Sequence, residues 1–135
     1  MSEQSAVPDP DAPCGCGSRA SYAECCGPIH AGIPAPTAER LMRSRYSAFV
    51  LRNVDYLLRS WDPETRPETL ELDAEIAWRR LFISDTTAGG PEDDEGYVTF
   101  TAIARSAGER FEQRERSYFA RGADGHWRYV DGETL

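Results

Sequence analysis

Four cysteines crowd into a short segment near the N-terminus, with the spacing Cys-x-Cys-x8-Cys-Cys. A disulfide framework spreads its cysteines over a small secreted fold, whereas reduced cytosolic thiols more often bind metals. The adjacent cysteine pair is also too close along the chain for easy disulfide geometry. The spacing therefore predicts a metal site whose ligands are Cys14, Cys16, Cys25 and Cys26.

Four thiolates suit Zn²⁺ in a closed tetrahedral site, which leaves no position for a catalytic water. We expect structural zinc as the cofactor, with an iron-sulfur cluster or free redox thiols as the alternatives. Gly15 and Gly17 let the backbone wrap tightly around the metal, and Ser18 can hydrogen-bond a sulfur atom. Tyr22 is expected to pack over the site, and His30 is expected in a surface loop rather than among the ligands.

Composition bounds the class of protein. The 135 residues are 40% hydrophobic and carry a net charge of −8, which is typical of a globular protein and argues against a nucleic-acid partner. No apolar run approaches the ~20 residues of a membrane helix, so no membrane partner is expected. Residues 1–13 have neither a basic start nor an apolar stretch, and are predicted to be a disordered tail rather than a secretory signal. We expect a cytoplasmic protein.

The middle of the chain has the signals of helices. Residues 27–36 contain three prolines and two glycines, which is typical of a linker, and Thr37 is a plausible N-cap. Apolar residues then recur at helical spacing, and a second helix is predicted over 54–61, before Pro63. A third, shorter helical piece is predicted from Pro67 to about Leu70.

After residue 72 the apolar pattern changes to a period of two, which predicts four strands. Glycine-containing turn signals separate them, so sequential hairpins in one antiparallel sheet are expected. Helices followed by strands indicate an α+β fold with the helices on one face of a curved sheet. We predict three regions: a tail (1–13), a cysteine module with its linker (14–36) and an α+β domain (37–135). The predicted strands are residues 76–85, 97–105, 110–121 and 126–131.

The cysteine segment also resembles a known motif. The stretch Cys-Gly-Cys-Gly-Ser-x3-Tyr-x2-Cys-Cys-Gly, residues 14–27, resembles the zinc motif at the C-terminal tail of the bacterial translocation ATPase SecA. In that family the four cysteines hold zinc and the module contacts other proteins. The resemblance implies the same four ligands here and a protein partner for the module. Of the basic residues usual between the serine and the cysteine pair, only Arg19 is present.

A wider resemblance covers most of the chain. The run PTAERLMRSRYSAF (36–49), the motif Glu-Arg-Ser-x-Phe (115–119) and the motif Gly-x-Trp-x-Tyr-Val-Asp-Gly (125–132) resemble the bacterial YchJ family. The resemblance implies a nuclear transport factor 2-like fold, a cone in which a curved sheet and helices enclose a pocket. It implies no established activity. Some members carry a second, C-terminal cysteine motif, which is absent here.

Strand periodicity places polar side chains inside such a cone. Glu115 and Ser117 share a face of the third strand, and Trp127, Tyr129 and Asp131 are predicted to share a face of the fourth. A buried carboxylate needs a partner, so an ion pair between Glu115 and Arg45, whose helix crosses the sheet, is predicted. Either this set is a polar network that fixes helices against sheet, or it is a ligand site. The predicted pocket residues are Arg45, Tyr46, Trp61, Glu115, Ser117 and Trp127.

Two functions are compatible with these features. A protein- or ligand-binding adaptor would expose an apolar patch beside Tyr22 and Ile29. A small-molecule enzyme would need a carboxylate such as Glu115 or Asp131 near a donor, for which the candidates are Tyr46, Tyr118 and His126. No phosphate-binding glycine loop, nucleophile elbow or metalloprotease helix occurs, which favours the adaptor. A third interpretation makes the thiolates redox or metal-transfer groups.

Overall fold

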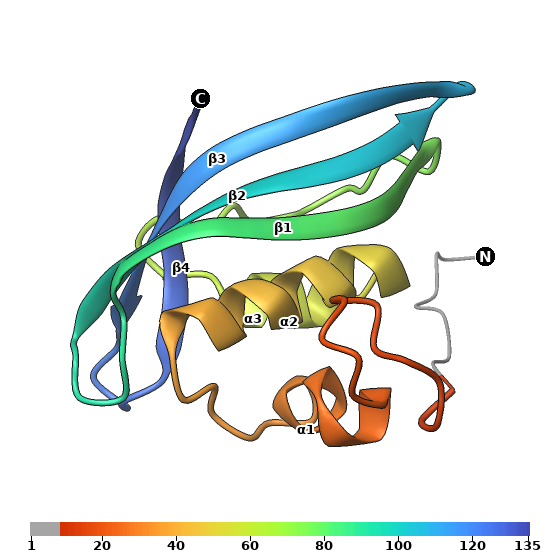
Figure 1. Cartoon of the computed structure of the whole chain (residues 1–135). Helices are drawn as coiled ribbons and strands as arrows, with labels where there is room; N and C mark the ends of the chain where they lie inside the picture. The colour runs from red at the N-terminus through yellow and green to blue at the C-terminus, as the bar shows by residue number, and fades with distance from the viewer. Residues whose placement is uncertain (1–8) are drawn as a thin grey trace.

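The computed structural model describes residues 9–135, in which short helices precede a four-stranded sheet (Figure 1). The predicted tail falls largely on residues 1–8, outside the described part. Residues 9–13 form turns, and Pro13 pairs with Ser21 in an isolated antiparallel bridge. The helices are a 3-10 turn, η1 (Tyr22–Glu24), and three α-helices, α1 (Cys26–His30), α2 (Ala38–Leu51) and α3 (Val54–Arg59).

Side-chain caps begin the two longer helices. The Thr37 hydroxyl accepts a hydrogen bond from the Arg40 amide at 3.1 Å, as its N-cap position predicts. α2 ends where Arg52 takes a left-handed conformation with φ of 58°. Asn53 then caps α3 by accepting from the Tyr56 amide at 3.1 Å. Each cap is a local signal, which is why the start of α2 was predictable.

The third predicted helical piece, residues 67–70, is wrong, and α3 ends at Arg59 rather than at residue 61. The segment after α3 pairs with the last strand instead of coiling. The Tyr129 amide donates to the Ser60 carbonyl at 2.9 Å, and the Asp62 amide donates to the Tyr129 carbonyl at 2.8 Å. The Thr65 hydroxyl donates to the Val130 carbonyl at 2.7 Å. These long-range bonds override the local helical preference.

The four strands form one antiparallel sheet in the order β1-β2-β3-β4, as predicted. The helices α2 and α3 lie along its concave face (Figure 1). Leu41 and Leu57 from the helices pack against Val98 and Phe119 from the sheet, and all four are buried. In the described residues no helix is long and apolar enough to cross a membrane. The strands are β1 (Ile76–Ala88), β2 (Glu95–Ser106), β3 (Glu109–Arg121) and β4 (Trp127–Thr134).

A bulge in β4 corrects one predicted face. Tyr118 pairs with Asp131, but the next residue, Phe119, pairs with Tyr129, so Val130 is an extra residue in β4. An extra residue reverses the alternation of side chains beyond it. Asp131 therefore lies on the outer face, opposite to Tyr129, and the prediction that it shares a face with Trp127 and Tyr129 is wrong.

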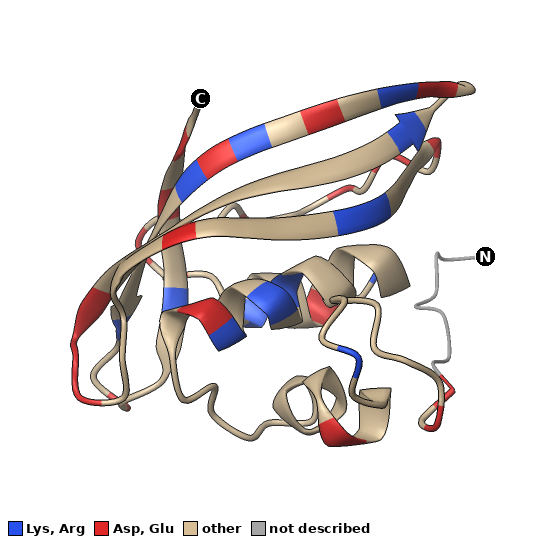
Figure 2. Ribbon diagram, viewed as in Figure 1, with Lys and Arg blue, Asp and Glu red and all other residues tan. Residues whose placement is uncertain are grey.

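The charges are unevenly distributed over the sheet. In β1 and β2 the arginines lie toward the end of the sheet at the turn between β2 and β3, whereas acidic residues lie toward the opposite end (Figure 2). Side chains that alternate away from the core carry most of these charges. The net charge of −8 consequently does not describe any single surface of the molecule.

Candidate metal centre and binding cavities

The four cysteine sulfurs converge on one point. All four Sγ atoms lie within 4.8 Å of one another, and all four residues are buried. The first two cysteines lie in the loop before η1, and the second two begin α1. Cys16 Sγ lies 3.6 Å from Cys25 Sγ, and no disulfide joins any of these four thiols in the described chain. Such a cluster has the donor number and the softness of a closed metal site.

The thiols impose strong mutual effects on their protonation. The hydrogen bond from Cys14 lowers the pKa of Cys16, and desolvation opposes this. The hydrogen bonds with Cys14 and Cys16 raise the pKa of Cys26, and burial raises it further. One thiolate is thus favoured at the expense of its neighbours, because several anions at this spacing repel one another. A divalent cation would remove that conflict, so the residues fit a metal ion.

Polar groups from inside and outside the module support the sulfurs. Ser18 Oγ lies 3.0 Å from Cys25 Sγ, as predicted for a serine near a metal-binding thiol. The guanidinium of Arg40 donates to Cys25 Sγ at 3.4 Å and to the Cys25 carbonyl at 3.1 Å. Arg43 donates to the Cys16 carbonyl at 3.2 Å. Sequence reasoning missed both arginines, and their only signal was the arginine-rich composition of the first long helix.

His30 is buried rather than exposed in a surface loop, so that expectation is wrong. Its Nδ1 lies 2.7 Å from the Tyr22 hydroxyl, and its Nε2 lies 2.8 Å from the Ser44 carbonyl. Burial lowers the pKa of His30, which favours the neutral ring. A neutral ring protonated on Nε2 donates to Ser44 and accepts from Tyr22. His30 thereby joins the module to α2, while Tyr22 packs against the cysteines as predicted.

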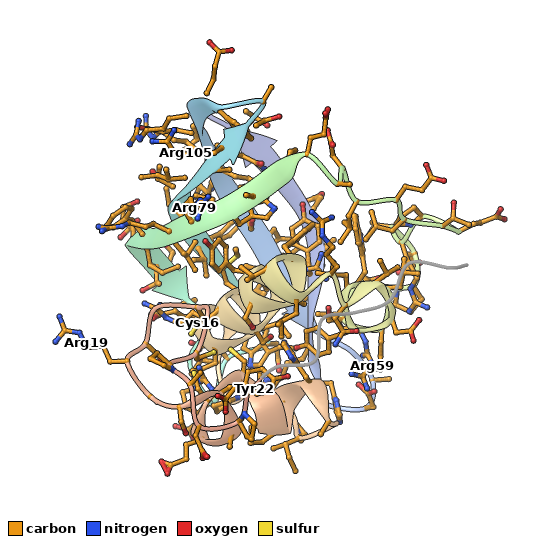
Figure 3. All side chains as sticks on the ribbon, turned by 90° about the vertical axis from the view of Figure 1, so that its right-hand side faces the viewer. Cys16, Arg19, Tyr22, Arg59, Arg79 and Arg105 are labelled. Carbon is orange, nitrogen blue, oxygen red and sulfur yellow. The ribbon has the colours of Figure 1, made fainter. Side chains whose placement is uncertain are left out.

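The seam between module and cone continues at Arg59, which donates to the His30 carbonyl at 2.7 Å. Figure 3 shows Arg59 on the side of the molecule that also carries Tyr22 and Cys16. Arg40 and Arg43 of α2 and Arg59 of α3 therefore bond to carbonyl groups of the cysteine segment. This arrangement fixes the module on the helices.

A cavity of about 210 Å³ lies between the helices and the sheet. Of the six predicted pocket residues, four line it: Arg45, Trp61, Glu115 and Ser117. Tyr46 and Trp127 do not line this cavity. Tyr46 is buried beside Trp78, and Trp127 faces another hollow. The other lining residues, which are not among the six predicted ones, are Met42, Phe49, Leu70, Phe100, Gln113 and Tyr129.

The predicted ion pair between Arg45 and Glu115 is wrong, since no such pair occurs in residues 9–135. Arg45 instead donates to the Leu57 carbonyl at 2.8 Å and to Ser60 Oγ at 2.7 Å. Its guanidinium lies 4.6 Å from the ring centroid of Tyr129, whose hydroxyl donates to Glu115 at 3.4 Å. Tyr129 thus stands between the two charges. Burial lowers the pKa of Arg45 to about 10, so the group is still a cation at neutral pH.

Neighbouring polar groups and a glycine position the Glu115 carboxylate. It accepts a hydrogen bond from Ser117 Oγ at 2.5 Å in addition to the bond from Tyr129. A Cβ on Gly132 would overlap the Glu115 carboxylate, so only glycine fits at this position of β4. Gly132 pairs with Ser117 across the strands. The absence of a side chain at this point of β4 therefore makes room for the carboxylate.

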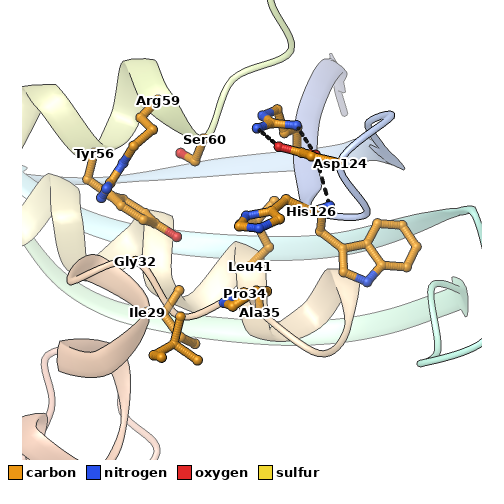
Figure 4. A pocket seen from close by; sticks show the side chains of 13 residues that line it. Ile29, Gly32, Pro34, Ala35, Leu41, Tyr56, Arg59, Ser60, Asp124 and His126 are labelled. Atoms are coloured by element: carbon orange, nitrogen blue, oxygen red, sulfur yellow. Dashed lines mark hydrogen bonds and ion pairs between the residues drawn. The ribbon is translucent and has the colours of Figure 1, made fainter.

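A second hollow, a groove of about 170 Å³, lies at the junction of the module and the cone (Figure 4). One wall comes from α1 and the linker, with Ile29, Ile33 and Pro34. The facing wall comes from α3 and the hairpin between β3 and β4, with Arg59 and His126. We call this hollow the junction groove. Neither part of the chain forms it alone.

The apolar patch expected beside Tyr22 and Ile29 is absent from that part of the described surface. Ile29 is buried, and its side chain belongs to the main core. Ile33, four residues later, is 60% exposed at the rim of the junction groove. The linker thus places an apolar side chain in solvent at the boundary of the two regions.

Comparisons with known proteins agree with this architecture. Residues 37–132 match the family model for the middle, NTF2-like domain of YchJ. A UPF0225 protein of Streptomyces coelicolor is 50% identical, covering 93% of this chain and 98% of that protein. A UPF0225 protein of Corynebacterium glutamicum is 45% identical, covering 90% of this chain and 96% of that protein.

Two solved structures share the fold. The solution structure of a SEC-C motif containing protein from Rhodopseudomonas palustris is similar with a TM-score of 0.78 and 32% identity, over 92% of this chain and 99% of that one. The crystal structure of a SEC-C motif containing protein from Psychrobacter arcticus gives a TM-score of 0.71 and 28% identity, over 88% and 79%. The cysteine cluster and the NTF2-like cone together with these matches lead to one conclusion: the chain belongs to the YchJ (UPF0225) family.

Proposed function

We propose that the four cysteines bind one structural zinc ion, and that the protein is a cytoplasmic adaptor whose junction groove binds a segment of a partner protein. The observation that carries the proposal is that the metal-binding module supplies one wall of the groove and the cone supplies the other. The zinc would hold the module, and the module would complete the groove. Free thiols fit a reducing compartment such as the cytoplasm.

The donor set supports zinc in particular. Four thiolates at tetrahedral spacing fill the coordination of Zn²⁺ and leave no open position for a substrate. Arg40 and Ser18 hydrogen-bond Cys25 Sγ, and such contacts offset the negative charge of a four-thiolate site. The metal would therefore act on structure. Metal analysis of the purified protein should give one zinc per chain, and iron or no metal would contradict the assignment.

The chemistry of the junction groove supports a peptide-like ligand. Ile33 and Pro34 offer apolar contact, while Arg59, His126 and an Asp124–Arg128 ion pair of 2.7 Å supply polar groups at the edge. Interfaces combine an apolar centre with a polar rim in this way. The groove is short, so a few residues of a partner would fill it.

A photo-crosslinking amino acid placed at position 33 tests this function in cells. We expect a discrete cross-linked product with a partner protein, and its loss in a Cys16→Ser background because the module wall collapses. The same amino acid at Thr87, an exposed position on β1, is the control. Identical products at both positions, or none at position 33, would contradict the adaptor.

A second candidate function is the binding or conversion of a small molecule in the inner cavity. Glu115 is held by Ser117 and Tyr129, and Trp61 Nε1 is buried without a hydrogen-bond partner in the described structure. A ligand that satisfies Trp61 would gain a hydrogen bond. A thermal-shift screen of metabolites should then find a stabilising compound whose effect disappears in Glu115→Gln. If no compound stabilises the native protein, the small-molecule function is contradicted and the adaptor function is the one that stays.

A further inference from the structure

The outer face of the sheet, which no helix of the described chain covers in Figure 1, carries a basic hollow of about 510 Å³ at the end formed by the turn between β2 and β3. The side chain of Phe82, which is 48% exposed, lies in this hollow. Figure 3 shows Arg79 and Arg105 at this end of the sheet, on neighbouring strands. The residues that line the hollow are Arg79, Arg80, Phe82, Ile103, Arg105 and Arg110.

The strand register brings these arginines close together, although their positive charges repel one another. A bulge in β1 between Trp78 and Arg80 lets two consecutive arginines line the same hollow. Arg105 and Arg110 pair directly across β2 and β3, where like charges are destabilising. An unfavourable arrangement of this kind is relieved when an anion binds. The hollow therefore has the electrostatics of an anion site.

Few carboxylates compensate this charge. Arg110 pairs with Glu112 at 3.0 Å, and Glu109 lies beside it in the chain. Arg105 donates to the Gly108 carbonyl at 3.4 Å, which is a neutral partner. Within residues 9–135, Arg79 and Arg80 form no ion pair. Three of the four guanidinium groups are thus available to an external anion.

Arginines and aromatic rings continue along the same outer face. Arg114 and Arg116 follow on β3, opposite Thr101 and Thr99 of β2. The Arg116 guanidinium lies 3.9 Å from the ring centroid of Tyr97. From Arg110 to Arg116 the strand rises by about 20 Å. The face therefore presents guanidinium groups interleaved with rings, with Glu112 between Arg110 and Arg114 and Glu133 opposite Arg116.

We propose that this face binds single-stranded nucleic acid, with phosphates on the arginines and a base stacked on Phe82. Arginine matches phosphate in a bidentate geometry, and an exposed aromatic ring on a basic sheet is a stacking platform. Only a base that is not already stacked in a duplex can stack on the Phe82 ring. The face should therefore prefer single strands to duplexes. From the net charge of −8 we expected no nucleic-acid partner. That charge is a sum over the whole chain, and it includes both this basic face and the acidic rest of the molecule. The proposal is independent of the junction groove.

The test is fluorescence anisotropy of a labelled 12-nucleotide oligouridylate with the full, zinc-loaded chain. We expect a dissociation constant of about 10 µM at low salt, and a slope of log affinity against log salt near −3, for about four phosphates. Phe82→Ala should weaken binding at least about fivefold. Arg80→Ala or Arg105→Ala should weaken it and reduce the slope by about 0.7. Arg66→Ala, which removes the same charge from the loop after α3, is the matched control and should bind as the native protein does.

Several outcomes would overturn the proposal. These are no binding at low salt, equal losses in Arg66→Ala and Arg105→Ala, or equal affinity for a 12-base-pair duplex. Tighter binding of an oligoglutamate peptide than of oligouridylate would assign the face to an acidic protein segment instead. A native dimer that Phe82→Ala converts into a monomer would assign it to a second copy of the chain. Far-ultraviolet circular dichroism of each variant verifies that the exposed substitutions leave the fold intact.

Discussion

The cysteine module and the cone differ in what stabilises each of them. The interior of the module consists of four thiols with Ala20 and Tyr22 packed against them, and its helices η1 and α1 have three and five residues. The cone has a continuous apolar core between α2, α3 and the sheet. Helices as short as those of the module are not stable by themselves in water. We therefore expect the module to depend on a bound metal for its stability, whereas the cone depends on apolar burial.

The seam between the two regions combines apolar contact, through Ile29 in the main core, with a set of hydrogen bonds. His30 bonds Tyr22 on one side and Ser44 on the other, and Arg40, Arg43 and Arg59 bond backbone carbonyls or sulfur of the module. Hydrogen bonds require fixed positions of both partners, whereas apolar contacts tolerate sliding. These bonds attach the cysteine segment to α2 and α3, two helices that also border the junction groove.

Removal of the metal should have the largest effect, and it should affect the module and the cone differently. Chelation, or Cys16→Ser, should unfold residues 14–30 while the sheet stays folded, because a structural zinc site contributes about 10–16 kcal/mol of apparent binding free energy to the segment that it organises. Hydrogen exchange measured by mass spectrometry should show lost protection in the module and retained protection in β2 and β3. Loss of protection throughout the chain would show that the two regions fold as one unit.

The converse change is Leu57→Ala in the cone. Leu57 is fully buried, so the free energy of unfolding of the cone should fall by about 3 kcal/mol, through lost burial and a residual cavity. Chemical denaturation followed by tryptophan fluorescence measures the loss. Leu58→Ala, at the partly buried neighbouring position, should cost less. Zinc stoichiometry should be unchanged in both variants, and metal loss in Leu57→Ala would contradict the separation.

Arg40→Met should weaken the metal site without removing a ligand. Arg40 donates to Cys25 Sγ, and loss of such a supporting contact lowers metal affinity by about 10- to 100-fold. Competition with a colorimetric zinc chelator measures the change. Arg43→Met is the matched control, because Arg43 contacts only a carbonyl of the module and should shift the affinity less. Equal effects of the two substitutions would mean that general charge, rather than the sulfur contact, supports the metal.

The smallest expected effect is a pH dependence at the seam. Burial lowers the pKa of His30 below its ordinary value of 6.5, so below pH 6.5 the unfolded chain binds more protons than the folded one. Stability from neutral His30 is therefore present above pH 6.5 and is lost as the pH falls toward the folded pKa. The loss should be smaller than that caused by Leu57→Ala, because it comes from the protonation of a single side chain.

Chemical denaturation at pH 7.5 and 6.0, in excess zinc, should show this loss in the native protein and a smaller one in His30→Asn. Excess zinc keeps the contribution of the cysteines common to both proteins. The control is His126→Asn, which replaces a partly buried histidine of the hairpin and leaves His30 in place. An unchanged pH dependence in His30→Asn would remove His30 from the seam.

Local patterns predicted much of the fold. The strand periods and glycine-containing turns predicted four sequential strands, and β1 begins at residue 76 as expected. The Thr37 cap predicted the start of α2. The predictions failed where a partner distant in sequence decides the conformation. Residues 67–70 are not helical because the preceding segment pairs with β4, and Asp131 faces outward because Val130 bulges.

The inner cavity shows the same division. Four of the six predicted residues line it, because strand alternation and helical spacing are regular. The pairing of Arg45 with Glu115 failed because charge alone does not say which groups meet. Tyr129 and Ser60 lie nearer to Arg45 and satisfy it by stacking and hydrogen bonding. Only the packing of α2 against β4 determines that choice.

The sequence by itself determined the four-cysteine cluster, the order of helices and strands, and the family resemblance that the comparisons confirm. Each depends on residues close together along the chain or on a regular period. The tertiary structure decided the polar seam at His30, the junction groove and the arginine-lined outer face. Each of these brings together segments far apart in the sequence, and their meeting depends on register, bulges and packing, which no local pattern contains.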